Sequence, residues 1–150
     1  MEKRINIFNK GREALKPLFA MGNYLHHSTI DQNLQELIKI RVSQINGCAY
    51  CLDMHWKDAR AMGETEQRLY GLSVWKESPY YSEKERAALL FTEAITASKM
   101  PDEIYSETSK HFSEQELVDL IVVANTINAW NRINIAFPNN IGTYQVGQFN

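Results

Sequence analysis

The chain has 150 residues, 44% of them hydrophobic and 23% charged, which suits one soluble domain with a sizeable core. Its 16 basic and 18 acidic side chains give a net charge of −2, whereas a nucleic-acid partner normally requires a basic excess. The longest nearly apolar stretch, 117–124, is too short for a membrane span, and no secretory signal is visible, so we expect a cytoplasmic protein without membrane partners.

The N-terminal third is helical in pattern. Residues 8–27 are expected to form a helix with a break, or a first-turn position, at Pro17. An amphipathic helix follows, because apolar residues recur three and four positions apart within 34–45. Asp31 is suited to cap the start of this helix, and Asn46-Gly47 is suited to end it.

The middle of the chain also predicts helices. One should run over 48–62 and end at Gly63, and a short helix should cover 64–72. Two capping boxes then mark helix starts, at Ser82 and at Ser113, because each serine is followed three residues later by a glutamate and then by an apolar periodic run.

The remaining segments complete an all-α prediction. Pro101 separates one helix from another expected over 102–112, and the tail 138–150 is expected to be an extended arm whose apolar residues pack on the same subunit or on a neighbour. No segment shows a convincing strand alternation. We therefore predict a single-domain helical bundle over residues 1–150, with about six to seven helices.

Two cysteines and a histidine share one helical face. Cys48, Cys51 and His55 lie at i, i+3 and i+7, so Cys51 is one turn from each of the others. Two thiols at this spacing can form a disulfide. Helix-start amides near Cys48 favour a thiolate, and the imidazole of His55 can take a thiol proton. The spacing therefore indicates redox chemistry.

Glu36 adds a carboxylate from the preceding helix. Almost no loop joins the two helices, so a side chain pointing inward there can orient His55 or hold a proton-relaying water. Burial at that position would raise the pKa of the Glu36 carboxyl.

The stretch 36–55 resembles a known family signature. A glutamate, eleven residues, Cys-x-x-Cys, three residues and a histidine form a pattern similar to that of AhpD-like alkylhydroperoxidases in the carboxymuconolactone decarboxylase superfamily. The segments 59–63 and 130–132 are similar too, and the resemblance extends over about residues 15–137. It implies an all-helical fold that assembles into a homo-oligomer, as a dimer, trimer or hexamer.

The resemblance also implies a function and a role for each site residue. Cys51 would attack a hydroperoxide, Cys48 would resolve the sulfenic acid to a disulfide, and His55 and Glu36 would relay protons. A lipoyl-type or thioredoxin-type dithiol would regenerate the pair, through Cys48 as the more accessible thiol. No cofactor and no metal ion is implied.

One position departs from the family pattern. The well-characterised peroxidases carry a histidine immediately before the second cysteine, where this chain has Tyr50. A phenol, with an ordinary pKa of about 10, is a poor base near neutral pH but can still donate a hydrogen bond as an auxiliary group. A general thiol-disulfide oxidoreductase or redox sensor with weak peroxidase activity is therefore the alternative function.

Further readings of the same residues are less favoured. A lactone decarboxylase fits the superfamily, but the decarboxylases that resemble this fold do not rely on a CxxC pair. A zinc-binding module would use Cys48, Cys51, His55 and Glu36, although zinc sites usually draw on two separated ligand pairs. Structural cysteines in a helix are the plainest reading. The three tryptophans, Trp130 among them, are interpreted as core or subunit-interface residues.

Overall fold

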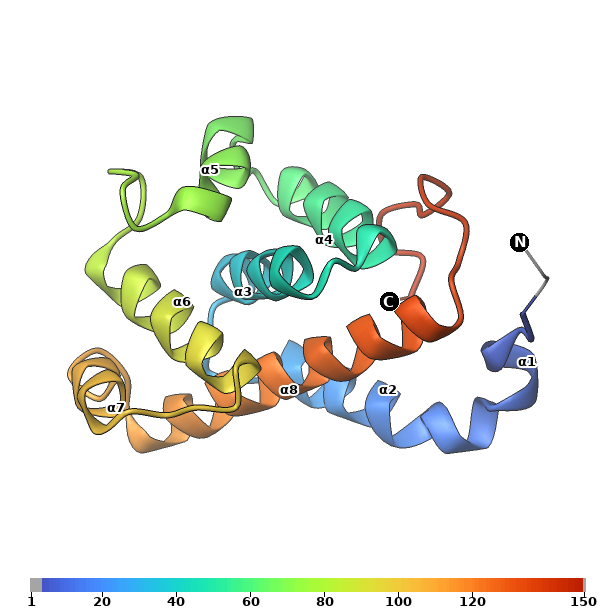
Figure 1. Cartoon of the computed structure of the whole chain (residues 1–150), viewed down its shortest axis with the longest axis horizontal. Coiled ribbons are helices and arrows are strands. Elements are labelled where there is room, and N and C mark those ends of the chain that lie inside the picture. Colours follow the sequence, from blue (N-terminus) through green and yellow to red (C-terminus); the bar gives the residue numbers. More distant parts are fainter. Residues whose placement is uncertain (1–3, 150) are drawn as a thin grey trace.

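The computed structural model describes residues 4–149, which form helices and connecting loops without a strand (Figure 1). The predicted all-α class is confirmed. The elements in chain order are α1 Ile7–Lys10, α2 Arg12–His26, α3 Gln32–Asn46, α4 Ala49–Ala61, α5 Glu66–Gly71, the 3-10 helix η1 Leu72–Val74, α6 Glu83–Thr96, α7 Asp102–Thr108 and α8 Glu114–Ala136. Across residues 4–149, no helix combines the length and apolar character that crossing a membrane requires.

The first predicted helix is divided in two, which raises the number of α-helices described to eight. The predicted break at Pro17 is wrong, because Pro17 lies inside α2. The chain instead breaks at Gly11, whose N–H donates to the carbonyl of Ile7. A Cβ atom at position 11 would lie 2.9 Å from that carbonyl oxygen, so the close approach depends on glycine.

The turn between α3 and α4 follows the predicted signals. The Asp31 side chain accepts hydrogen bonds from the amides of Asn33 and Leu34, and α3 ends at Gly47 in the left-handed conformation. Cys48 is the N-cap of α4, one position outside the helix that was predicted to begin there. This turn therefore brings the cysteines directly beside the end of α3.

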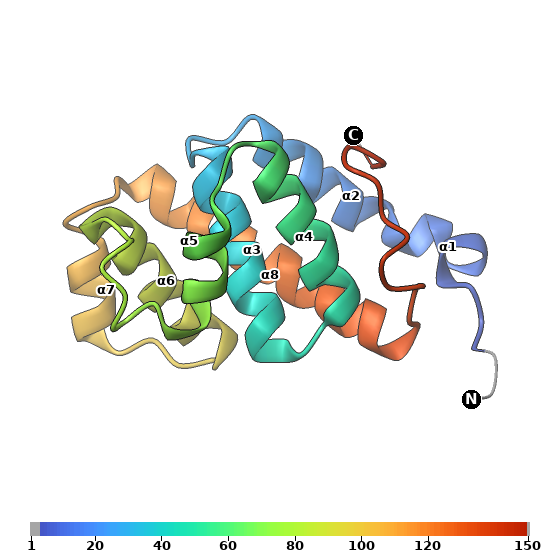
Figure 2. The same ribbon diagram turned by 90° about the horizontal axis from the view of Figure 1, so that it is seen from above.

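Both capping boxes form as predicted, at the starts of α6 and α8. Helix α7 is shorter than the predicted 102–112, because its last turn ends at Thr108 with Ser109 as the C-cap. Helix α3 contacts α4, α6 and α8 and lies among them (Figures 1 and 2). Its buried face joins the core, whose largest fully buried side chains include Leu37, Ile38, Phe91 and Leu120.

The tail after α8 is irregular and folds back over α4. The Lys57 ammonium donates to the carbonyls of Gly142 and Tyr144, and the Tyr144 hydroxyl donates to Asp58. Tyr144 is buried as a result. The tail therefore packs on its own chain and lies at the same end of the molecule as α1 (Figures 1 and 2).

Candidate functional site

The two cysteines form a disulfide at the start of α4. Their Cα atoms are 5.4 Å apart, within the usual range for a disulfide, so the predicted ability to form this bond is confirmed. Cys48 Sγ also accepts a hydrogen bond from the Cys51 amide at 3.3 Å, as an N-cap side chain does. The sulfurs therefore lie at the end of α4 where the helix amides favour negative charge.

Both cysteines are buried in the apolar core. Cys48 is 2% exposed and Cys51 0%, and both belong to the cluster that contains Ile38 and Ile127. The exposed fractions of the two cysteines are nearly equal, so they do not support the expectation that Cys48 is the more accessible thiol. A reductant needs a local opening of the α4 start to reach either sulfur.

Glu36 and His55 are brought together across the α3–α4 contact. Glu36 Oε2 lies 2.7 Å from His55 Nδ1, and Glu36 Oε1 lies 2.7 Å from the Lys39 ammonium. An ionised carboxylate accepts hydrogen bonds only, so His55 donates from Nδ1 and keeps its Nε2 lone pair when neutral. This arrangement fixes the ring and leaves Nε2 as the atom that can accept a proton.

The pKa of Glu36 is shifted in the direction opposite to the one expected. Burial alone raises the pKa of its carboxyl. The charges of His55 and Lys39 and their hydrogen bonds have the larger, opposite effect, and the net pKa is about 2. The expected rise in this pKa is therefore wrong, because burial is outweighed by two partners on one carboxylate.

Sequence reasoning missed Asp58 and Tyr144. One ligand atom from each of Glu36, His55 and Asp58 lies within 4.8 Å of the others. Burial raises the pKa of Asp58, while the hydroxyl of Tyr144, 2.9 Å from both carboxylate oxygens, acts in the opposite direction. The three-residue spacing from His55 could have identified Asp58, but the sequence carries no signal for Tyr144.

The same groups are the candidates for binding a cation. Glu36, His55 and Asp58 are close enough to share one, but Lys39 already pairs with one carboxylate and Tyr144 hydrogen-bonds the other. The zinc set proposed as an alternative loses its sulfur ligands in the disulfide form.

Tyr50 lies in the first turn of α4 and is buried. Burial, and secondarily the charge of Asp53, raise the pKa of its phenol. Tyr50 is therefore no base near neutral pH and can act through hydrogen bonds of its hydroxyl or as a packing group.

A pocket of about 330 Å³, which we call the aromatic pocket, lies against these residues. Its apolar lining includes Trp130, whose ring packs against Phe8 and Phe19. The interpretation of Trp130 as a core or interface residue is thus incomplete, because its side chain lines a pocket. The site residues that share this lining are Gln35, Glu36, Lys39, Tyr50, Met54, His55, Asp58 and Tyr144.

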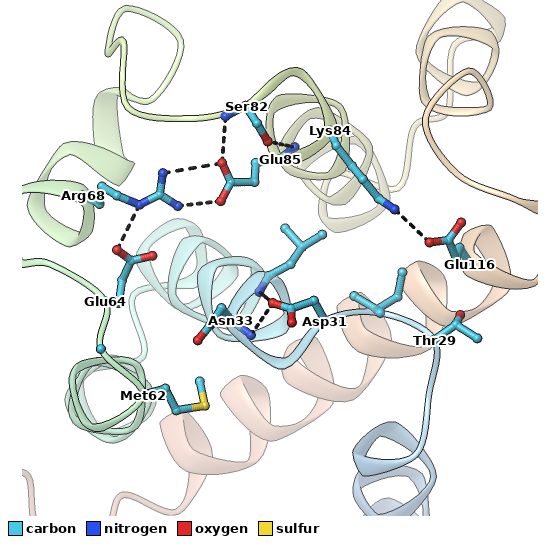
Figure 3. Close-up of a pocket in the computed structure, with 13 residues that line it drawn as sticks. Thr29, Asp31, Asn33, Met62, Glu64, Arg68, Ser82, Lys84, Glu85 and Glu116 are labelled. Carbon is cyan, nitrogen blue, oxygen red and sulfur yellow. Dashed lines mark hydrogen bonds and ion pairs between the residues drawn. The ribbon is translucent and has the colours of Figure 1, made fainter.

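A second pocket of about 480 Å³, the charged pocket, lies between the start of α3, the end of α4 and the starts of α6 and α8 (Figure 3). Arg68 pairs with Glu64 and Glu85, and Lys84 pairs with Glu116. These charges satisfy one another, which is typical of structural ion pairs.

A sequence model of the carboxymuconolactone decarboxylase family matches residues 12–94. The chain belongs to this family. Within it, the chain is 47% identical over 142 residues to the uncharacterized protein YdfG of Bacillus subtilis, covering 93% of the chain and 97% of YdfG. The predicted family membership is therefore confirmed.

Solved structures of related proteins have the same fold. One, from Agrobacterium tumefaciens, is described as a protein of unknown function and a candidate antioxidant defence protein AhpD; it has a TM-score of 0.89 and 40% identity, covering 95% of this chain and 100% of that one. A peroxidase-related protein from Silicibacter has a TM-score of 0.79 and 26% identity, covering 92% and 75%. The family member described here thus has an AhpD-like fold.

Proposed function

We propose that the protein is a peroxidase-type oxidoreductase that reduces hydroperoxides through Cys48 and Cys51. The observation that carries this proposal is the disulfide at the start of α4, one turn from a histidine whose ring is held by a buried carboxylate. The descriptions of the two solved relatives, as an antioxidant defence candidate and as peroxidase-related, support the same chemistry.

The first step is attack on the hydroperoxide. His55 Nε2 takes the proton of the Cys51 thiol, and the thiolate attacks one oxygen of the O–O bond. An S–O bond forms, the O–O bond breaks, and the leaving oxygen receives the proton from His55. Cys51 is oxidised to a sulfenic acid, and the hydroperoxide is reduced to an alcohol, or to water when the substrate is hydrogen peroxide.

The second step closes the disulfide. The Cys48 sulfur gives up its proton and attacks the sulfenic sulfur of Cys51, so an S–S bond forms, the S–O bond breaks, and the hydroxyl leaves with that proton as water. This product corresponds to the oxidised state of the structure. An external dithiol, lipoyl-type or thioredoxin-type, then reduces the pair and is itself oxidised to a disulfide.

Tyr50 favours a second candidate function. The phenol occupies the place of a histidine in the better-known relatives, and its raised pKa leaves the site with one imidazole base near the cysteines. A thiol-disulfide oxidoreductase that exchanges disulfides with a partner, and reduces peroxides only slowly, would need no second base.

Hydroperoxide consumption driven by dihydrolipoamide tests the proposal in wild type, Cys51→Ser and Cys48→Ser. We expect Cys51→Ser to reduce the rate to background and Cys48→Ser to allow at most one turnover, with a sulfenic acid on Cys51 visible by mass spectrometry. Equal rates in all three proteins would contradict the peroxidase. Slow peroxide turnover together with rapid reduction of a disulfide substrate would favour the second candidate.

A further inference from the structure

The turn that leads into Cys48 is held to α8 by asparagine side chains. Helix α8 contacts both α3 and α4, the two helices that this turn joins (Figures 1 and 2). The amide of Asn46, the last residue of α3, donates at 2.9 Å to the side-chain oxygens of both Asn128 and Asn131. Asn128 is itself fixed, because it donates to the Thr96 hydroxyl at 3.0 Å. The side-chain amide of Asn46 therefore directs both of its N–H donors to α8.

A second set of contacts leads from α8 to the backbone of Cys48. The Asn131 amide donates to the Ser43 hydroxyl at 3.1 Å, and both residues are buried. The carbonyl of the same serine accepts the Cys48 N–H at 3.0 Å. The turn is thus fixed to α8 through Asn46 and through Ser43. We call Ser43, Asn46, Asn128 and Asn131 the polar network.

The place of the polar network bears on access to the disulfide. Both cysteines are buried, so a reductant reaches a sulfur only when the start of α4 opens locally. Opening the turn separates Asn46 from its partners on α8, and each hydrogen bond lost makes the open form less favourable. Buried hydrogen bonds that share members also strengthen one another. The polar network should therefore make this opening rarer.

We propose that Asn46 and Asn131 are positioning residues of the redox pair: they hold the Cys48 turn against α8, which slows reduction of the disulfide and keeps the Cys48 sulfur beside Cys51 in the dithiol form. Both act through the turn rather than on the reacting atoms. A looser turn lowers the effective concentration of one thiol near the other, so the disulfide becomes easier to reduce. The inference rests on the proposed function, because it assigns a control on the same pair.

The rate at which dithiothreitol reduces the disulfide, measured without peroxide, tests the proposal. In this reaction the S–S bond breaks, each cysteine gains one electron and one proton, and dithiothreitol is oxidised to its cyclic disulfide. We expect roughly tenfold faster reduction in Asn46→Ala, which loses two hydrogen bonds, and roughly threefold faster reduction in Ser43→Ala, which loses one.

Ile40→Val is the matched control for a general loss of stability. Ile40 lies on the same helix and is 0% exposed, but it belongs to the core cluster around Leu37 and Leu69, which does not contain the cysteines. Shortening this side chain lowers the free energy of unfolding without touching the polar network. Its disulfide should be reduced at the wild-type rate. The proposal is overturned if Asn46→Ala is reduced no faster than Ile40→Val.

The equilibrium in a buffer of reduced and oxidised dithiothreitol gives a readout that a merely structural role would not change. We expect the ratio of disulfide to dithiol protein to fall roughly fivefold in Asn46→Ala, because Cys48 is held less firmly beside Cys51, and to stay unchanged in Ile40→Val. Mass spectrometry after alkylation measures this ratio. An unchanged ratio in Asn46→Ala would contradict a positioning role.

Neither measurement uses peroxide, so together they separate the inference from the proposed function. If wild type consumes no hydroperoxide, the proposed function is wrong, whereas faster reduction and a lower ratio in Asn46→Ala would still support the inference. If wild type consumes hydroperoxide but Asn46→Ala matches Ile40→Val in both measurements, the inference alone is wrong.

Discussion

The two pockets of this protein differ in the side chains that line them: one is rich in charged groups, the other in apolar and aromatic groups. In the charged pocket, each of the ion pairs Arg68–Glu64, Arg68–Glu85 and Lys84–Glu116 joins a cation to a carboxylate from the chain itself (Figure 3). The aromatic pocket is lined instead by apolar side chains such as Phe19, Val146 and Phe149, together with polar groups of α3 and α4, the two helices that meet at the disulfide.

The two pockets differ in whether their lining groups already have interaction partners within the protein, and this difference separates a structural site from a candidate binding site. Charges that pair with one another leave little for a ligand to bind, whereas exposed apolar surface is available to a ligand. Variants that change one carboxylate in each pocket can therefore test the assignment directly.

The largest effect is expected from an isosteric change of one carboxylate in each pocket. Glu36→Gln should lower kcat/KM for hydroperoxide by roughly 10²–10³-fold, because a neutral amide no longer holds His55 as a base. Glu85→Gln should leave kcat/KM unchanged and lower the melting temperature, because Glu85 pairs with Arg68 and caps α6. Steady-state kinetics and thermal unfolding measure both. Equal kinetic losses in the two variants would remove the distinction between the pockets.

Acid should lower the stability of wild type more than that of Glu36→Gln. Since the folded pKa of about 2 lies below the ordinary 4.5, the ionised carboxylate stabilises the fold fully above about pH 4.5, and this contribution is lost as the pH falls toward 2. At about 1.4 kcal/mol per pH unit of difference, the whole effect is about 3 kcal/mol. Urea unfolding between pH 7 and pH 2 should show a smaller acid-dependent loss for Glu36→Gln than for wild type. If the free energy of unfolding falls equally with pH in both proteins, the ionised Glu36 carboxylate does not stabilise the fold.

Arg68→Met should destabilise the protein by about 2 kcal/mol, because two partly buried carboxylates lose their shared cation. Its specific peroxidase activity at 25 °C should equal that of wild type. Lys84→Met is the matched control, since the ion pair with Glu116 is more exposed and should cost less than about 1 kcal/mol. Urea unfolding gives the free energies, and an activity loss in Arg68→Met would assign a function to the charged pocket.

The smallest effect concerns the anchor of the tail. Tyr144→Phe removes the hydroxyl that donates to Asp58 and should cost about 1 kcal/mol. Proteolysis after 138 should become faster, because the segment opens more often. Tyr105→Phe, on the exposed face of α7, serves as the control. An unchanged cleavage rate in Tyr144→Phe would mean that Lys57 and packing alone hold the tail.

Local signals made most of the fold predictable. Asp31, Gly47 and the two capping-box serines set helix boundaries through hydrogen bonds within four residues, so their effect is visible in the sequence. The break at Gly11 was not foreseen, because the close approach to Ile7 depends on the chain path rather than on a residue pattern. In the sequence, Pro17 predicts a helix break more strongly than Gly11 does, because its ring removes a helix hydrogen bond.

The site was predictable only in part, because its members come from different elements. The cysteines and His55 lie at the start of and within one helix, and the short connection to the preceding helix indicated Glu36. Asp58 lies one turn beyond His55, but an acidic residue on a helix is usually a solvated charge. Tyr144 reaches the site only because the tail folds back over α4, and such long-range packing leaves no periodic trace in the sequence.

The location of both sulfurs at one helix end has a consequence for the proposed redox cycle. In the proposed cycle, the bond that opens and closes spans four consecutive residues, Cys48 to Cys51, so no helix must leave another for it to form. We therefore expect the oxidised and reduced proteins to scatter X-rays almost identically in solution. Local opening of the α4 start, which admits peroxide and reductant to the buried sulfurs, would then limit the rate of the proposed reaction, rather than a rearrangement of the bundle.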